Sequence, residues 1–198
     1  MQKDFYIFRH GESTYNVAGR IQGRTNNSEL TDRGCLQARE VGRFLADKKI
    51  GLLIASPLKR ALQTAEIVNE FLGVPVMTDE RFTEVNVGVI EGLHYTEAMA
   101  RYGDDYAKWR ERENRYPDFC FEGGESRRQV QQRVFEGLRD WAEKPDCVSI
   151  AIASHGIMLG QTMISLGAAD KEADNGSILH IRYADGKWSF IELITVKS

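Results

Sequence analysis

Two histidines in this sequence occupy the same local setting, directly after a short apolar run that is typical of a buried strand. Arg9-His10-Gly11-Glu12 follows the run 5–8, and Ser154-His155-Gly156 follows the run 148–153. A neutral imidazole can attack phosphorus and form a covalent intermediate. A single histidine at a strand end is more often structural than catalytic, so the interpretation depends on the residues placed around it.

Two arginines share this setting and suit a phosphoryl group. Arg9 precedes His10, and Arg60 lies shortly after Ser56, where a second buried run, 52–55, ends. Guanidinium groups match the oxygens of a phosphoryl group and keep their charge at working pH. Ligands of open α/β sheets bind beyond the carboxyl ends of the parallel strands. If the three strands are neighbours, two histidines and two arginines meet in one crevice that could bind and attack a phosphoryl group without a metal.

The elements needed to position these residues can be read from hydrophobic periodicity. Short apolar runs alternate with helical patterns, which predicts an α/β fold with a largely parallel sheet. We expect a short third strand at 74–77 and a helix over 157–166. The Asp185-Gly186 pair predicts a hairpin whose last strand is antiparallel and lies at a sheet edge. Three helix starts are expected from their capping signals: Thr31, Ser56 followed by Pro57, and Ser126 with Gln129.

Composition bounds the remaining possibilities. The 198 residues fit one domain, 1–198, and 26 basic against 29 acidic residues give a net charge of −3. That balance predicts no general attraction for nucleic acid or for an anionic membrane, so anion binding requires a local positive cluster. Neither a signal peptide nor a membrane-spanning run is recognisable. Three cysteines without metal-ligand spacing, Cys35, Cys120 and Cys147, predict free thiols and a cytoplasmic protein.

The segment 93–121 fits no element of the sheet and is interpreted as an insertion. It combines aromatic residues such as Tyr106 and Trp109 with arginines such as Arg110. One interpretation is an amphipathic helix with a solvated charged face. The other is a lid over the site that selects the leaving group. The sequence leaves both open.

Several segments, taken together and in order, resemble one known family, the histidine phosphatase superfamily, also called phosphoglycerate mutase-like. The first is Phe8-Arg9-His10-Gly11-Glu12-Ser13-Thr14-Tyr15-Asn16, in which Tyr15 stands where tryptophan is commoner. A second departure is 26–29, which replaces the usual Asp-x-Pro of the turn. The similarity continues through Gly23, Leu30-Thr31, Gly34, Gln37-Ala38, 56–65, 84–92, Gly124-Glu125-Ser126 and Ser154-His155-Gly156.

The resemblance implies a fold and a set of roles. The fold would be a three-layer α/β/α sandwich. His10 would be the nucleophile and Glu84 the general acid, with no cofactor and no metal. The phosphoryl group and substrate would be held by Arg9, Arg60, His155, Asn16, Gln22 and Gly23.

Chemistry alone does not single out Glu84. Glu80, Glu84 and Glu91 lie close together in the sequence, and each could donate a proton to a leaving oxygen. Only the resemblance selects Glu84 among them. His94 and His180 lack any motif context, and we interpret both as structural or surface residues.

Three functions are compatible with these residues. The leading hypothesis is a phosphomonoesterase of the broad-specificity phosphatase branch, acting on a small phosphorylated metabolite. The second is a cofactor-dependent phosphoglycerate mutase, and the third a phosphate-recognition module without turnover, which would need neither His10 nor Glu84. The short chain after the last strand and the segment 86–92 favour hydrolysis over isomerisation. The sequence leaves the oligomeric state open, with a homodimer among the options.

Overall fold

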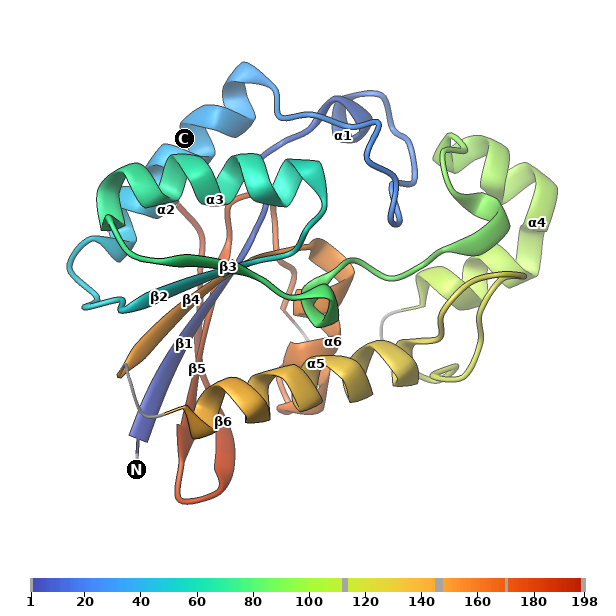
Figure 1. Ribbon diagram of the computed structural model, residues 1–198. Helices are drawn as coiled ribbons and strands as arrows, with labels where there is room; N and C mark the ends of the chain where they lie inside the picture. The colour runs from blue at the N-terminus through green and yellow to red at the C-terminus, as the bar shows by residue number, and fades with distance from the viewer. Residues whose placement is uncertain (1, 112–113, 145–147, 170, 197–198) are drawn as a thin grey trace.

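The central sheet of the protein has the expected mixed character. In the part of the chain that the computed structural model describes (residues 2–111, 114–144, 148–169 and 171–196), six strands form one sheet in the order β3-β2-β4-β1-β5-β6 (Figure 1). The four parallel strands are β1 (Gln2–Arg9), β2 (Leu52–Ala55), β3 (Val76–Thr78) and β4 (Ser149–Ser154). β5 (Ile178–Ala184) runs antiparallel to β1, and β6 (Lys187–Ile194) antiparallel to β5 at the edge. The predicted sheet type and its terminal hairpin are confirmed.

Helices cover both faces of this sheet. α2 (Asp32–Leu45) and α3 (Lys59–Leu72) pack on one face, while α5 (Arg127–Glu143) and α6 (Gly156–Ser165) pack on the other (Figure 1). Alternate residues of β1 supply the two cores: Phe5 and Ile7 face α5 and α6, and Tyr6 and Phe8 face α2 and α3. Burial on both faces explains why the strands are continuous apolar runs. The three-layer sandwich is confirmed.

Two of the three predicted helix starts are correct. The Thr31 hydroxyl accepts a hydrogen bond from the Gly34 N–H at 3.0 Å, and Ser126 forms the expected capping box with Gln129. The prediction for Ser56 is wrong, because α3 begins at Lys59 and its N-cap, Leu58, has no side-chain cap. The Ser56 hydroxyl accepts a long local hydrogen bond from the Leu58 N–H at 3.4 Å and lies 2.7 Å from Nε2 of His155. Its shorter contact is therefore with a residue 99 positions away.

The segment 93–121 contains one long helix, α4 (Tyr95–Arg110), which is interrupted at Gly103, where φ is +44°. In Figure 1 this helix stands to one side of the sheet, beyond its carboxyl edge. Three shorter elements complete the described chain: α1 (Thr14–Val17), η1 (Glu80–Phe82) and η2 (Gly88–Ile90).

Two predictions concern features outside the sheet. No helix in the described residues is long and apolar enough to cross a membrane. Cys35 and Cys120 are free thiols, as expected, whereas Cys147 lies outside the described residues.

Candidate active site

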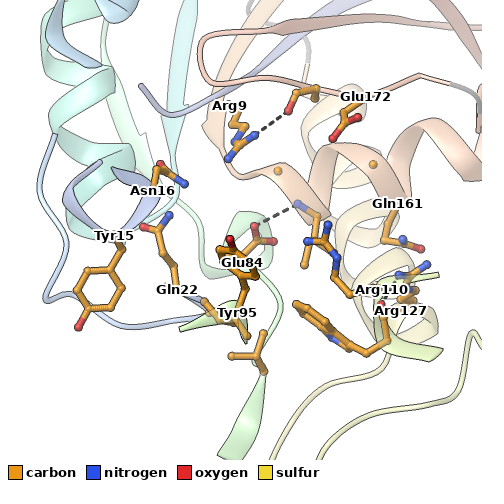
Figure 2. Close-up of a pocket in the computed structure, with 18 of the residues that line it drawn as sticks. Arg9, Tyr15, Asn16, Gln22, Glu84, Tyr95, Arg110, Arg127, Gln161 and Glu172 are labelled. Atoms are coloured by element: carbon orange, nitrogen blue, oxygen red, sulfur yellow. Dashed lines mark hydrogen bonds between the residues drawn. The ribbon is translucent and has the colours of Figure 1, made fainter. Parts of the chain in front are cut away.

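The candidate site lies at the carboxyl edge of the parallel strands. β2, β4 and β1 are adjacent, so the residues that follow them, Ser56, His155 and His10, share one edge of the sheet. The rings of His10 and His155 lie 5.3 Å apart at 61°. A cleft of about 920 Å³ opens here. Its walls include the following residues that the sequence had indicated: Arg9, His10, Asn16, Gln22, Gly23, Arg60 and Glu84. Figure 2 labels four of them, Arg9, Asn16, Gln22 and Glu84.

The hydrogen bonds of His10 define which ring nitrogen is available. Nδ1 lies 2.7 Å from the Gly11 carbonyl, which can only accept, so the proton is assigned to Nδ1. Nε2 therefore carries the lone pair, and it accepts a hydrogen bond from Nε of Arg60 at 3.2 Å. The unprotonated nitrogen of His10 thus faces a guanidinium group.

The surroundings of His10 keep its ring neutral. Burial, followed by the charges of Arg60 and Arg9, holds the pKa of His10 well below its usual value of 6.5. The side chain is only 2% exposed. A neutral imidazole is the form that can attack phosphorus, so the site does not need to remove a proton from Nε2 first.

Two arginines supply positive charge beside His10. Arg60 is held in place by the carbonyl oxygens of Gly23 and Thr25, at 2.8 and 3.0 Å. Burial is the main reason that its pKa falls to about 10, so it stays charged at neutral pH. Arg9 donates to the Ala173 carbonyl at 2.8 Å, while its buried Nε has no hydrogen-bond partner among the described residues.

A close backbone contact sets the position of the loop after β1. Gly11 packs on Gly34 so tightly that a Cβ atom on Gly11 would lie 2.2 Å from the Gly34 carbonyl oxygen. The Gly11 N–H also donates to the Thr64 hydroxyl at 3.2 Å. Both glycines are therefore required by the close approach of α2 to the loop after β1, and not by an unusual φ angle.

His155 takes a less direct position than the sequence suggested. It is fully buried, packs edge-on against His10 and does not line the cleft in the described structure. Burial and the Arg60 charge hold its pKa well below 6.5. The Ser56 hydroxyl occupies Nε2, and Nδ1 has no partner among the described residues. His155 thus contacts the His10 ring without lining the cleft in the described structure.

Two side-chain amides line the cleft on the side of the first loop. The Ser13 N–H donates to Oδ1 of Asn16 at 3.1 Å, and the single proton of the Ser13 hydroxyl can be donated to Oε1 of Gln22 at 3.0 Å. With both amide oxygens engaged in this way, the NH₂ groups are the ends left to donate to a ligand. Asn175, which sequence reasoning missed, bonds to the His10 carbonyl at 3.0 Å and to Oδ1 of Asn16 at 3.3 Å. It lies in a loop before β5 and carries no periodic or motif signal.

Of the three candidate acids, only Glu84 lies in the cleft. Its carboxylate accepts hydrogen bonds from the N–H groups of Ile157 and Met158, at 3.1 and 3.2 Å, where α6 begins (Figure 2). Glu80 and Glu91 are exposed and do not line the cleft within the described chain. The tertiary structure therefore places one of the three candidate glutamates, Glu84, in the cleft.

The outer wall of the cleft comes from the segment 93–121 and its neighbours. Tyr95, Met99, Tyr106 and Trp109 of α4 line it together with Ile164 of α6. In Figure 2, Glu84 lies between Gln22 on one side and Arg110 and Arg127 on the other. Arg127 donates to the Trp109 carbonyl at 2.5 Å, which ties the start of α5 to the end of α4. The wall is mainly apolar, with guanidinium groups at its far end.

The remaining predicted residues have structural partners. His94 caps α4, with its Nδ1 accepting from the Thr96 N–H at 3.3 Å, and His180 contacts the Asp4 carboxylate at 2.8 Å while stacking on Tyr6. In the described residues, no group of three His, Cys, Asp or Glu side chains could hold a metal ion.

A neutral imidazole, two arginines and a carboxyl group therefore line one cleft. Comparison with known proteins shows which family carries this arrangement. Residues 5–195 match the histidine phosphatase superfamily (branch 1), and the chain belongs to this family.

The curated relatives carry names of two kinds, phosphatase and probable phosphoglycerate mutase. The chain is 29% identical to the uncharacterized phosphatase PhoE of Bacillus subtilis over 187 residues, covering 92% of this chain and 89% of that protein. It is 34% identical over 190 residues to a protein of Klebsiella pneumoniae named probable phosphoglycerate mutase GpmB, covering 92% of this chain and 86% of that protein.

Solved structures show the same fold. YhfR of Bacillus stearothermophilus superposes with a TM-score of 0.86 at 26% identity, over 95% of both chains. A mycobacterial glucosyl-3-phosphoglycerate phosphatase, solved with VO3, gives a TM-score of 0.83 at 25% identity, over 95% of this chain and 97% of that one. The family and the phosphoglycerate mutase-like fold that the sequence suggested are therefore confirmed.

Proposed function

We propose that this protein is a phosphomonoester hydrolase that works through a phosphohistidine on His10. The observation that carries the proposal is the state of the His10 ring: neutral, with its Nε2 lone pair directed at the Arg60 guanidinium in a cleft. A phosphoryl group bound by Arg9 and Arg60 would have its phosphorus next to Nε2, and the guanidinium charges would offset the charge on its oxygens.

The reaction would run in two in-line steps. In the first, Nε2 of His10 forms a bond to phosphorus as the ester oxygen leaves, and Glu84 donates a proton to that oxygen. In the second, Glu84 takes a proton from water, the water oxygen bonds to phosphorus, and the N–P bond breaks to release phosphate. Asn16 and Gln22 would bind the phosphoryl group, and His155 would act through its contact with the His10 ring. We propose that no metal takes part, because the arginines already provide the positive charge.

The substrate would be a small phosphorylated metabolite. We propose that the segment 93–121 is a lid whose α4 residues contact the leaving group, since Met99 and Tyr106 line the outer cleft. A mutase remains the second candidate, because one of the relatives is named as such at 34% identity.

Trapping the intermediate tests the proposal. Substrate labelled on phosphorus is mixed with the enzyme, with and without a chelator, and quenched in base, in which a phosphoramidate is stable. We expect label on His10 in both samples. We expect the His10→Ala variant to take up no label and to turn over many orders of magnitude more slowly than the parent. His180→Gln, at a histidine that contacts Asp4 and does not line the cleft in the described structure, is the matched control and should keep both the label and the turnover. Turnover by His10→Ala within tenfold of the parent would refute the nucleophile. Loss on chelation with rescue by a divalent metal would refute metal independence.

A further inference from the structure

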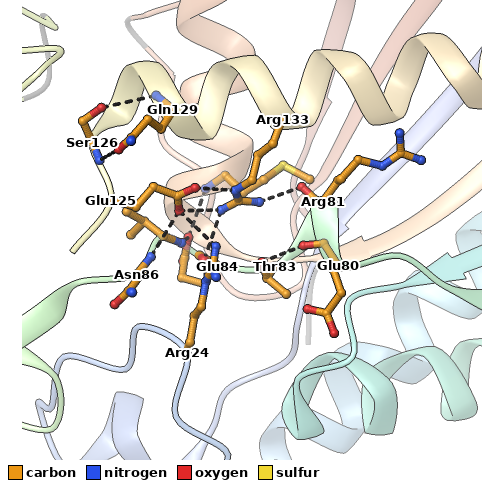
Figure 3. Close-up of polar contacts among 12 residues, drawn as sticks. Arg24, Glu80, Arg81, Thr83, Glu84, Asn86, Glu125, Ser126, Gln129 and Arg133 are labelled. Carbon is orange, nitrogen blue, oxygen red and sulfur yellow. Dashed lines mark hydrogen bonds and ion pairs between the residues drawn. The ribbon is translucent and has the colours of Figure 1, made fainter. Parts of the chain in front are cut away.

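The main-chain carbonyl of Glu84 is held by two arginines that come from distant parts of the chain. Nε of Arg24 and Nη2 of Arg133 each donate to it at 3.2 Å (Figure 3). Arg24 lies in the loop before α2, and Arg133 lies on α5. The residue in the position of the general acid is thus fixed at its backbone as well as at its carboxylate.

Both arginines also bind one carboxylate, that of Glu125. Arg133 approaches it with a fork, Nε to Oε1 at 2.7 Å and Nη2 to Oε2 at 3.0 Å, and Arg24 adds Nη2 to Oε2 at 3.2 Å. Bidentate arginine–carboxylate pairs fix geometry as well as charge. Glu125 therefore sets the orientation of the two guanidinium groups that hold Glu84.

Glu125 is itself anchored to the segment that carries Glu84. Its N–H donates to the Asn86 carbonyl at 2.7 Å, and its Oε2 accepts from the Asn86 N–H at 3.3 Å. The side chains of Glu125 and Arg133 are only 14% and 15% exposed. Arg133 also donates Nη1 to the Arg81 carbonyl at 2.6 Å, so it holds both ends of the segment 81–84.

We propose that Glu125 is a positioning residue for Glu84, acting through Arg24 and Arg133. This inference depends on the proposed role of Glu84 as general acid. In the described structure none of the three positioning residues lines the cleft, so they act on a substrate only through the residues they hold. The inference gives a role to Glu125 of the Gly124-Glu125-Ser126 segment, which the reaction scheme leaves without one.

The reason for such a device lies in the backbone around Glu84. The segment 83–87 belongs to no helix or strand, so no regular ladder of hydrogen bonds fixes it. A misplacement of about 1 Å can lower a rate by about 10²-fold. Arginine forks that each span a carbonyl and a carboxylate can hold such a segment more rigidly than single contacts.

The test separates positioning of the acid from general damage. Proton donation matters for a basic alkoxide leaving group, as in glycerol phosphate, and little for nitrophenolate. We expect Glu125→Gln to lower kcat on glycerol phosphate by about tenfold or more, with nitrophenyl phosphate affected by less than about threefold. Arg24→Gln, at a side chain that is 40% exposed, is a second variant that the fold should tolerate. We expect it to lower kcat on glycerol phosphate more than kcat on nitrophenyl phosphate, by a smaller factor than Glu125→Gln does. Glu70→Gln, which breaks a surface pair with Arg39 at 2.8 Å, is the matched control and should change neither rate.

A double variant completes the experiment. If Glu125 acts through Glu84, then adding Glu125→Gln to Glu84→Gln should cause no further loss on glycerol phosphate. Equal losses on both substrates, or additive losses in the double variant, would overturn the positioning role. If Glu84→Gln alone shows no preference for the activated substrate, the proposed acid itself is wrong, an outcome that the single variants distinguish from a failure of Glu125.

Discussion

Lowering the pH from about 6.5 to about 5.5 should destabilise this protein, because two of its histidines are buried in neutral form. His10 and His155 are 2% and 0% exposed. Burial first, and then nearby arginine charges, hold the pKa of each well below 6.5 in the folded state. In the unfolded chain the pKa of each ring returns to its ordinary value of about 6.5. At a pH between the folded-state and the unfolded-state pKa, the unfolded chain binds protons that the folded protein does not.

The sign and size follow from proton linkage. Stability rises with pH wherever the unfolded state binds more protons, so it is full above about pH 6.5 and falls as the pH decreases. One histidine contributes up to about 1.4 kcal/mol per pH unit, and near pH 5.5 the two together contribute at most about 2.5 kcal/mol per unit. Carboxyl groups whose pKa is lowered in the folded state, such as Asp4, Asp79 and Glu125, have ordinary values of 3.8 to 4.5 and contribute mainly below this window.

Urea unfolding between pH 7.5 and 5.5 measures this slope. The buffer must be free of phosphate, because an anion that binds the folded state would add its own stabilisation. We expect His155→Asn to reduce the slope near pH 5.5 by about half. Val76→Ala, on the exposed face of β3, removes no ionisable group and should leave it unchanged. A parent protein whose free energy of unfolding is flat from pH 6.5 to 5.5 would refute the buried neutral histidines.

Two further predictions concern the fate of the phosphoryl group and the choice of substrate. With phosphoglycerate, with and without its bisphosphate, we expect inorganic phosphate to exceed isomerised product, and many isomerisations per phosphate released would favour the mutase. Met99→Ala should raise KM for bulky phosphomonoesters such as naphthyl phosphate by about threefold or more, through lost apolar contact, and leave KM for ethyl phosphate unchanged. Met77→Ala on β3, at a methionine of similar exposure (47% against 53%), is the control. An equal rise in KM in both variants would refute the contact between α4 and the leaving group.

The sequence alone determined the α/β character of the fold and the position of the loop that carries His10. These features follow from local rules: a strand buried on both faces must be a continuous apolar run, as in Phe5 to Phe8. The polar residue that follows such a strand lies at the sheet edge, where ligands bind, which is how His10 could be named from its neighbours. Capping at Thr31 and Ser126 is equally local, since the donor is three residues from the acceptor.

Features that depend on distant segments were decided only by the tertiary structure. Ser56 has the residue type and position of a helix cap, yet its hydroxyl contacts His155. Glu80, Glu84 and Glu91 are equivalent in the sequence, and only packing against the start of α6 brings one of them into the cleft. Asn175 carries no local signal at all, although it touches the His10 backbone.

The physical reason is the range of the interactions. Periodicity and capping involve residues within a few positions of one another, so the chain displays them directly. The contacts that complete the site join residues about 50 to 165 positions apart, from Arg60 on His10 to Asn175 on His10, and they depend on which strands become neighbours. The position of His10 at the end of a buried strand could therefore be predicted from the sequence. Which residues surround it was decided by the strand order β2-β4-β1 and the packing of the loops.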